Sequence, residues 1–99
     1  MTILQLRYAV EVAQAGSINR AAQSLLIGQP NLSRAIRELE TLLGFSLFTR
    51  SSQGMVPTAA GRHFLSEAQE LLRQFDALEA KYTGLGTEEG FSISVPRAS

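Results

Sequence analysis

Polar side chains that can bond to the edges of bases are concentrated in one short stretch of the sequence, at Gln29, Asn31, Ser33 and Arg34. Arginine can bond bidentately to guanine, and glutamine or asparagine to adenine, with each contact contributing roughly 1–3 kcal/mol of discrimination. Arg37 follows one helical turn after Ser33. We therefore interpret this stretch as a candidate reader of base pairs.

The stretch also has the apolar spacing of a helix, at Leu32, Ile36, Leu39 and Leu43. At 100° per residue these side chains form one narrow stripe, and Pro30, Arg34 and Arg37 lie on the opposite side. Pro30 is tolerated in the first turn, where its missing N–H has no partner in any case. An alternative is an ordinary solvated face whose arginines pair with Glu38 and Glu40, and the helix alone does not decide between the two.

Two shorter helices are predicted before it. The first runs from about Thr2 to Ala15 and ends at Gly16, with inward positions at Ile3, Leu6, Val10 and Ala13. Ser17 can cap the second, INRAAQSL, whose inward residues are Ala21, Ala22 and Leu25. A tight turn at Gly28 then separates it from the arginine-bearing helix, which we expect to run from Gln29 to about Leu43.

A two-stranded hairpin is predicted next. Its apolar runs are Phe45–Phe48 and Met55–Val56, which flank the polar RSSQG, with Gly54 near the tip. Pro57 restricts the second strand to an edge or an end. Helix, short turn, helix and hairpin together are the layout of a winged helix-turn-helix, in which the wing can offer Arg50, Ser51 and Ser52 to phosphates.

Thr58 can cap a long helix that we expect to extend to about Tyr82. Its apolar residues alternate by four and three, as in a coiled-coil seam, and we assign to a dimer interface Phe64, Ala68, Leu71, Leu72, Phe75, Leu78 and Tyr82. The stripe could instead pack against its own domain, but it carries more apolar surface than a domain this small needs for its core. An exposed seam of this kind on a monomer would favour aggregation.

Charge is divided unevenly along the 99 residues, although the net charge is zero. Residues 1–65 carry six arginines against three acids, and residues 66–99 carry three bases against six acids. This split indicates that the first part meets an anion. The chain has no cysteine, which excludes disulfides and thiolate metal sites and agrees with a cytoplasmic protein. No apolar run approaches the length of a membrane span.

Enzymatic readings have little support. His63 is the only histidine, and Asp76 lies about 20 Å further along the same helix at 1.5 Å per residue. Glu67 and Glu70 have no metal-ligand partner nearby, and GLGTEEG follows a helix and lacks the lysine of a phosphate-binding loop. We expect no catalytic residue, no metal site and no cofactor in these residues.

Several motifs in order resemble the N-terminal DNA-binding domain of LysR-type bacterial transcriptional regulators: GS…RAA, QPNLSRAIRELE, LG…LF.R and T.AG, within roughly residues 3–82. The resemblance implies base or backbone contacts by Gln29, Pro30, Asn31, Ser33 and Arg34, and phosphate contacts by Ser17, Arg20, Arg50 and Thr58. It also implies linker helices paired antiparallel, so that two winged domains face one interrupted palindrome of double-stranded DNA. Gly28 and Gln53 depart from the family pattern, which has serine before QP and a basic residue near the wing tip.

We therefore expect a mostly α fold, with a winged helix-turn-helix in residues 1–58 and a dimerisation helix in residues 59–84. Residues 85–99 would be a linker and the first strand of a ligand-binding domain that senses a small-molecule effector; the whole regulator could be a tetramer. The rival hypothesis is a dimeric helical protein-interaction module that does not bind DNA specifically.

Overall fold

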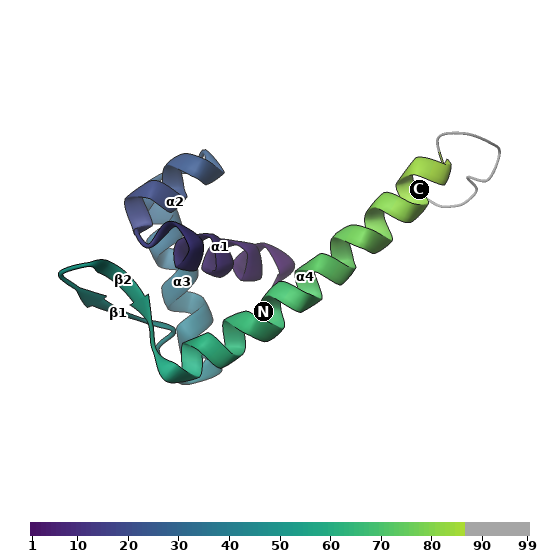
Figure 1. Cartoon of the computed structure of the whole chain (residues 1–99). Coiled ribbons are helices and arrows are strands. Elements are labelled where there is room, and N and C mark those ends of the chain that lie inside the picture. The colour runs from purple at the N-terminus through teal and green to yellow at the C-terminus, as the bar shows by residue number, and fades with distance from the viewer. Residues whose placement is uncertain (87–99) are drawn as a thin grey trace.

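The computed structural model describes residues 1–86, in which helices predominate and one two-stranded hairpin is present (Figure 1). The elements are α1 (Ile3–Ala15), α2 (Ile18–Leu25), α3 (Gln29–Leu43), β1 (Phe48–Ser51), β2 (Gly54–Pro57) and α4 (Ala59–Gly86). The first three helices form a body and the hairpin projects from one side of it; α4 starts beside the hairpin, passes along α1 and extends beyond the body on the opposite side (Figure 1). This confirms the predicted winged helix-turn-helix followed by a long helix.

Side-chain caps begin α1 and α2; the cap at Ser17 was predicted, and the structure adds one at Thr2. The Thr2 hydroxyl accepts from the N–H of Gln5, and the Gln5 side chain accepts from the N–H of Thr2, which forms a capping box. Ser17 caps α2 by accepting from the N–H of Arg20. Gly28 caps α3 without a side-chain bond, as expected for glycine in place of serine.

The core of the body is broader than the predicted stripes. Leu6, Val10, Leu32, Ile36 and Leu39 are buried as expected, but Ala9 and Val12 are fully buried as well. The reason is that α1 packs against α2, α3 and α4, so neighbours cover it from more than one side. A single stripe read from helical spacing underestimates such a face.

The wing starts later than predicted. The expected first strand was Phe45–Phe48, whereas β1 is Phe48–Ser51, paired antiparallel with β2. The backbone of Leu47 is engaged elsewhere, because its N–H donates to Glu40 (2.7 Å) and its carbonyl accepts from the N–H of Thr58 (2.9 Å). The second strand ends at Pro57, which agrees with the predicted restriction of proline to an edge or an end.

Helix α4 is longer than predicted and protrudes. It continues to Gly86 instead of ending near Tyr82; its last glycines lower helix propensity but, unlike proline, do not block the helix. Leu65, Ala68 and Leu72 pack against the body, and every described side chain from Arg73 to Thr83 is exposed. The protrusion gives a radius of gyration of 16.4 Å, against about 13 Å for a compact domain of 100 residues.

Candidate nucleic-acid interface

The N-terminal half of α3 presents its polar side chains outward. Gln29, Pro30, Asn31, Arg34 and Arg37 are exposed, and Ser33 is half-buried. Leu32, Ile36 and Leu39 fix this orientation because they are buried in the core on the opposite side. The helix therefore carries its hydrogen-bonding groups toward solvent at the end where helix dipoles favour anions.

The arginines of α3 are not neutralised by the acids beside them. Within residues 1–86, ion pairs join only Arg7 to Asp76 and Arg73 to Glu70. Glu38 and Glu40 were the suggested partners for these arginines. Neither forms an ion pair within residues 1–86, and the Glu40 carboxylate accepts from the backbone N–H groups of Leu47 and Phe48 instead. The alternative of a salt-bridged solvated face is therefore wrong for Glu40.

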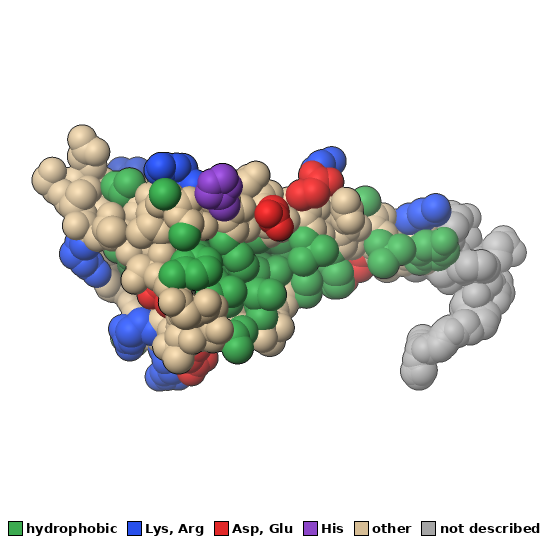
Figure 2. Space-filling view, turned by 90° about the horizontal axis from the view of Figure 1, so that it is seen from below, with side chains coloured by type: hydrophobic (Ala, Val, Ile, Leu, Met, Phe, Trp, Pro, Cys, Tyr) green, Lys and Arg blue, Asp and Glu red, His purple; other side chains and the backbone are tan. Residues whose placement is uncertain are grey.

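The wing brings a further arginine next to α3. Arg50 is exposed on β1 opposite Met55. Ser33 and Arg37 of α3 line one hollow together with Arg50, with Glu40 and Phe48 also contributing to its walls. Two arginines far apart in sequence thus border a common recess, and basic side chains gather at this end of the molecule (Figure 2).

The position of the wing depends on a close backbone contact. The N–H of Met55 donates to the carbonyl of Gly16 (3.1 Å), which ties β2 to the turn between α1 and α2. A Cβ added to Gly54 would lie 2.3 Å from the same carbonyl oxygen, and Gly54 has φ +110°. Only glycine allows this approach.

Three hydroxyls assigned to phosphates already have partners within the chain. Ser17 caps α2, and Ser51 accepts from Gln53 and donates to the Gly54 carbonyl. The Thr58 hydroxyl accepts from Gly61 (2.9 Å) and donates to the Ser46 carbonyl (2.7 Å), so it caps α4 and holds the segment before the wing. Arg20 and Ser52 are exposed, and they remain open to a ligand.

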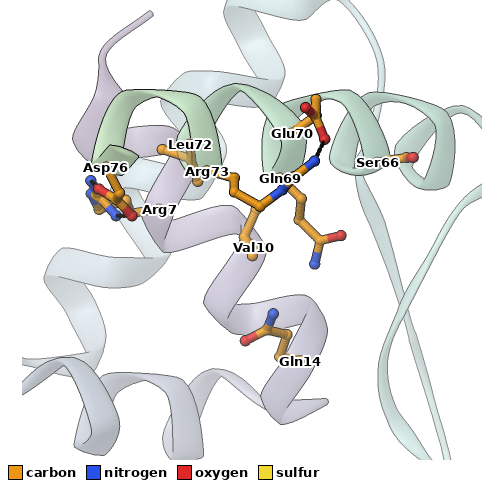
Figure 3. Close-up of a pocket in the computed structure, with 9 residues that line it drawn as sticks. All are labelled: Arg7, Val10, Gln14, Ser66, Gln69, Glu70, Leu72, Arg73 and Asp76. Carbon is orange, nitrogen blue, oxygen red and sulfur yellow. Dashed lines mark hydrogen bonds and ion pairs between the residues drawn. The ribbon is translucent and has the colours of Figure 1, made fainter. Parts of the chain in front are cut away.

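A second hollow lies between α1 and α4 (Figure 3). Its charged groups are paired with one another: Arg7 donates to Asp76, and Arg73 donates to Glu70. These bonds lower the pKa of the Asp76 and Glu70 carboxyl groups and raise the pKa of Arg7. Because its charges are satisfied in this way, the hollow offers little to a charged ligand. Sequence reasoning did not detect the Arg7–Asp76 pair, since nothing local links residues 69 positions apart.

The dimer seam assigned from the sequence divides into two groups. Ala68 and Leu72 belong to the core of their own chain, and Phe64 is half-buried beside it. The other members remain exposed, with exposed fractions of 49% for Leu71, 36% for Phe75, 58% for Leu78 and 49% for Tyr82. Packing against the chain's own domain thus describes part of the stripe, and the remainder is uncovered.

Within residues 1–86, we find no cluster of acidic or histidine side chains that could hold a metal ion, and no helix is sufficiently long and apolar to cross a membrane.

A helix-turn-helix whose second helix exposes polar and basic groups at its N-terminus, followed by a β-wing, defines a class of DNA-binding domains. Residues 3–62 match the family described as "Bacterial regulatory helix-turn-helix protein, lysR family". The chain therefore belongs to the LysR family, and residues 1–86 contain its winged helix-turn-helix DNA-binding domain and long helix.

Curated relatives agree with this assignment. The HTH-type transcriptional regulator TfdT of Cupriavidus pinatubonensis is 49% identical over 72 residues, which cover 73% of this chain and 32% of TfdT. The uncharacterized HTH-type transcriptional regulator YcgK of Bacillus subtilis is 38% identical over 97% of this chain and 30% of YcgK. The chain thus spans about a third of the length of these relatives.

Solved structures give the same fold. The BenM DNA-binding domain in complex with catB site 1 DNA has a TM-score of 0.82 and 34% identity, covering 96% of this chain and all of that one. The CbnR DNA-binding domain in complex with DNA has a TM-score of 0.78 and 35% identity, covering 87% and 99%.

Proposed function

We propose that this chain recognises an interrupted palindrome of double-stranded DNA as a homodimer, with α3 in the major groove of each half-site. Base contacts come from Gln29, Asn31, Ser33 and Arg34. Pro30 lies in the first turn of α3, at the end of the helix that enters the groove. Arg20, Arg37 and Arg50 contact phosphates on either side, together with Ser52 at the wing tip. Ser17, Ser51 and Thr58 act mainly by positioning these elements, because their hydroxyls are bonded within the chain.

One observation carries the proposal: Arg34 and Arg37 are exposed on α3 and, within residues 1–86, form no ion pair. Unpaired arginines on the outward face of a core-anchored helix are what phosphate and guanine recognition need. Arg50 adjoins the same recess from the wing. Structures of related domains in complex with DNA support this docking.

The test is selection of binding sites from random DNA, followed by fluorescence anisotropy at two salt concentrations. We expect an interrupted palindrome, bound with a steep salt dependence because counterions are released. Arg34→Ala should relax base preference at one position, by roughly 1–3 kcal/mol. Arg37→Ala should weaken all sequences alike and lower the salt slope by about one. Glu38→Ala, on the same helix, is the matched control.

The rival, a protein-interaction module that does not bind DNA specifically, predicts equal weak binding to every sequence and no effect of Arg34→Ala. That result would overturn the proposal. We further propose that the protein acts in the cytoplasm, where bacterial operator DNA lies. Because the chain spans about a third of the length of its curated relatives, we also propose that the full-length regulator carries a separate effector-binding domain.

A further inference from the structure

Glu40 places an acidic side chain in the recess that Arg37 and Arg50 border. It lies one helical turn after Arg37 on α3, and both residues also line the adjoining hollow at the C-terminal end of that helix. Figure 2 shows acidic side chains among the basic ones at this end of the molecule. An acid thus lies beside two arginines that we assign to DNA phosphates.

The carboxylate of Glu40 is held in place by backbone groups. Its Oε2 atom accepts from the N–H of Leu47 (2.7 Å) and from the N–H of Phe48 (3.4 Å), in the segment that leads into β1. Arg37 is close enough along α3 to pair with Glu40, but within residues 1–86 neither residue forms an ion pair. The negative charge is therefore fixed at the recess.

Anchoring the start of β1 requires an acceptor but does not require a charge. A glutamine amide oxygen also has two lone pairs and could accept from the same two N–H groups, although a carboxylate makes stronger bonds. A fixed negative charge beside Arg37 and Arg50 repels the phosphates that these arginines attract. Such a charge can still improve recognition, if it opposes incorrect binding more than correct binding.

The repulsion acts unequally because Glu40 lies deeper than the arginines. Glu40 is half-buried, whereas Arg37 and Arg50 are exposed. Non-specific binding depends on phosphate contacts alone and has no fixed register, so phosphates also enter the recess and approach the carboxylate. Base contacts by α3 select one register in the specific complex, and there phosphates meet the outer ends of the two arginines.

We propose that Glu40 is a specificity-determining residue, whose fixed carboxylate repels phosphates that enter the recess between Arg37 and Arg50. Non-specific binding is thereby weakened more than binding to the operator. This inference rests on the proposed function and adds a repelling group to the attracting ones. Glu40 also positions the wing, but that role depends on its bonds to Leu47 and Phe48, whereas the repulsion depends on its charge.

Two substitutions in the full 99-residue chain separate the charge from the bonds. Glu40→Gln keeps an acceptor oxygen at the same reach and removes the charge. Glu40→Asp keeps the charge but is one methylene shorter, which weakens the bonds to Leu47 and Phe48. Fluorescence anisotropy gives the dissociation constants for the selected palindrome and for a scrambled duplex of equal length and composition. Their ratio measures discrimination, after correction for the folded fraction obtained from thermal unfolding.

We expect Glu40→Gln to bind the scrambled duplex about two- to threefold more tightly at low ionic strength, as one unit charge about 6 Å from a phosphate predicts. Its affinity for the palindrome should change little, so the ratio should fall about twofold. Glu40→Asp should keep the natural ratio although it is less stable. Glu38→Gln is the matched control, because it removes an exposed acid from the same helix outside the recess. It should affect both duplexes alike.

The outcomes distinguish this inference from the proposed function. An unchanged ratio in Glu40→Gln, or an equal fall in Glu38→Gln, would overturn the role of the Glu40 charge while leaving recognition of the palindrome intact. A ratio that falls as far in Glu40→Asp as in Glu40→Gln would assign the effect to the backbone bonds, and would also overturn it. If the natural chain prefers no sequence, the proposed function fails, and this inference fails with it.

Discussion

Arg7 on α1 and Asp76 on α4 form a bidentate ion pair, with N–O distances of 2.5 and 3.3 Å. The Arg7 guanidinium also lies 5.8 Å from the centroid of the Phe75 ring. Leu72 is the last buried residue of α4 before this point. The pair therefore joins body and helix at the level where α4 leaves the body.

The Arg7–Asp76 pair makes the free energy of unfolding depend on pH in the acidic range. The hydrogen bond from Arg7 lowers the pKa of Asp76 below its ordinary value of 3.8, so the stabilisation is present above that value and is lost as pH falls through the lower folded-state pKa. We expect the free energy of unfolding to decrease with pH below about 4 less steeply in Asp76→Asn than in the natural chain. Urea titrations at several pH values measure this. Adding 1 M salt should reduce the difference at this exposed pair, and a difference that salt leaves unchanged would contradict an ionic origin.

Gly54→Ala should detach the wing from the turn between α1 and α2. The added Cβ would lie 2.3 Å from the Gly16 carbonyl oxygen, at a residue with φ +110°, and we expect roughly 2–4 kcal/mol of destabilisation. Gly44→Ala is the matched control, because φ is +86° there but a Cβ would meet nothing within 4 Å. It should cost about 1 kcal/mol. Urea unfolding measures the loss of stability in both variants. Equal losses would show that the close approach of Gly54 to the Gly16 carbonyl adds nothing to the cost of the backbone conformation.

Glu40→Ala should loosen the connection between α3 and the wing. It leaves the N–H groups of Leu47 and Phe48 without their carboxylate acceptor, which should destabilise the chain by about 1–3 kcal/mol. Glu38→Ala removes an exposed acid on the same helix and should change stability by less than about 0.5 kcal/mol. Thermal unfolding of both variants checks this. A Glu38→Ala effect as large as that of Glu40→Ala would argue for a general charge effect instead of the specific bonds.

Thr58→Val should destabilise the junction of wing and α4 by about 1–2 kcal/mol, because it removes the cap on Gly61 and the bond to the Ser46 carbonyl. Thr58→Ser keeps both bonds and should recover most of that loss. Once corrected for the folded fraction, DNA affinity should be nearly the same in both variants. A loss of DNA affinity in Thr58→Val that is absent in Thr58→Ser would instead support the direct phosphate contact inferred from the family resemblance.

Local patterns in the sequence were enough to predict the helices of the body. Ser17 and Gly28 cap helices where expected, and Leu32, Ile36 and Leu39 turn α3 so that its arginines face outward. These features depend on backbone hydrogen bonds and on side-chain spacing within one helix, both of which are local in sequence. The polar face of α3 could be predicted for the same reason.

Tertiary structure alone decided the contacts between elements. Glu40 bonds to the backbone before β1, Arg7 pairs with Asp76, and Ala68 is buried in the core of its own chain. Each depends on how close two distant segments come, and helical spacing does not contain that distance. The sequence determined which residues face outward on each helix. Packing decided which of those outward faces the chain covers itself and which it leaves for DNA or for a second copy.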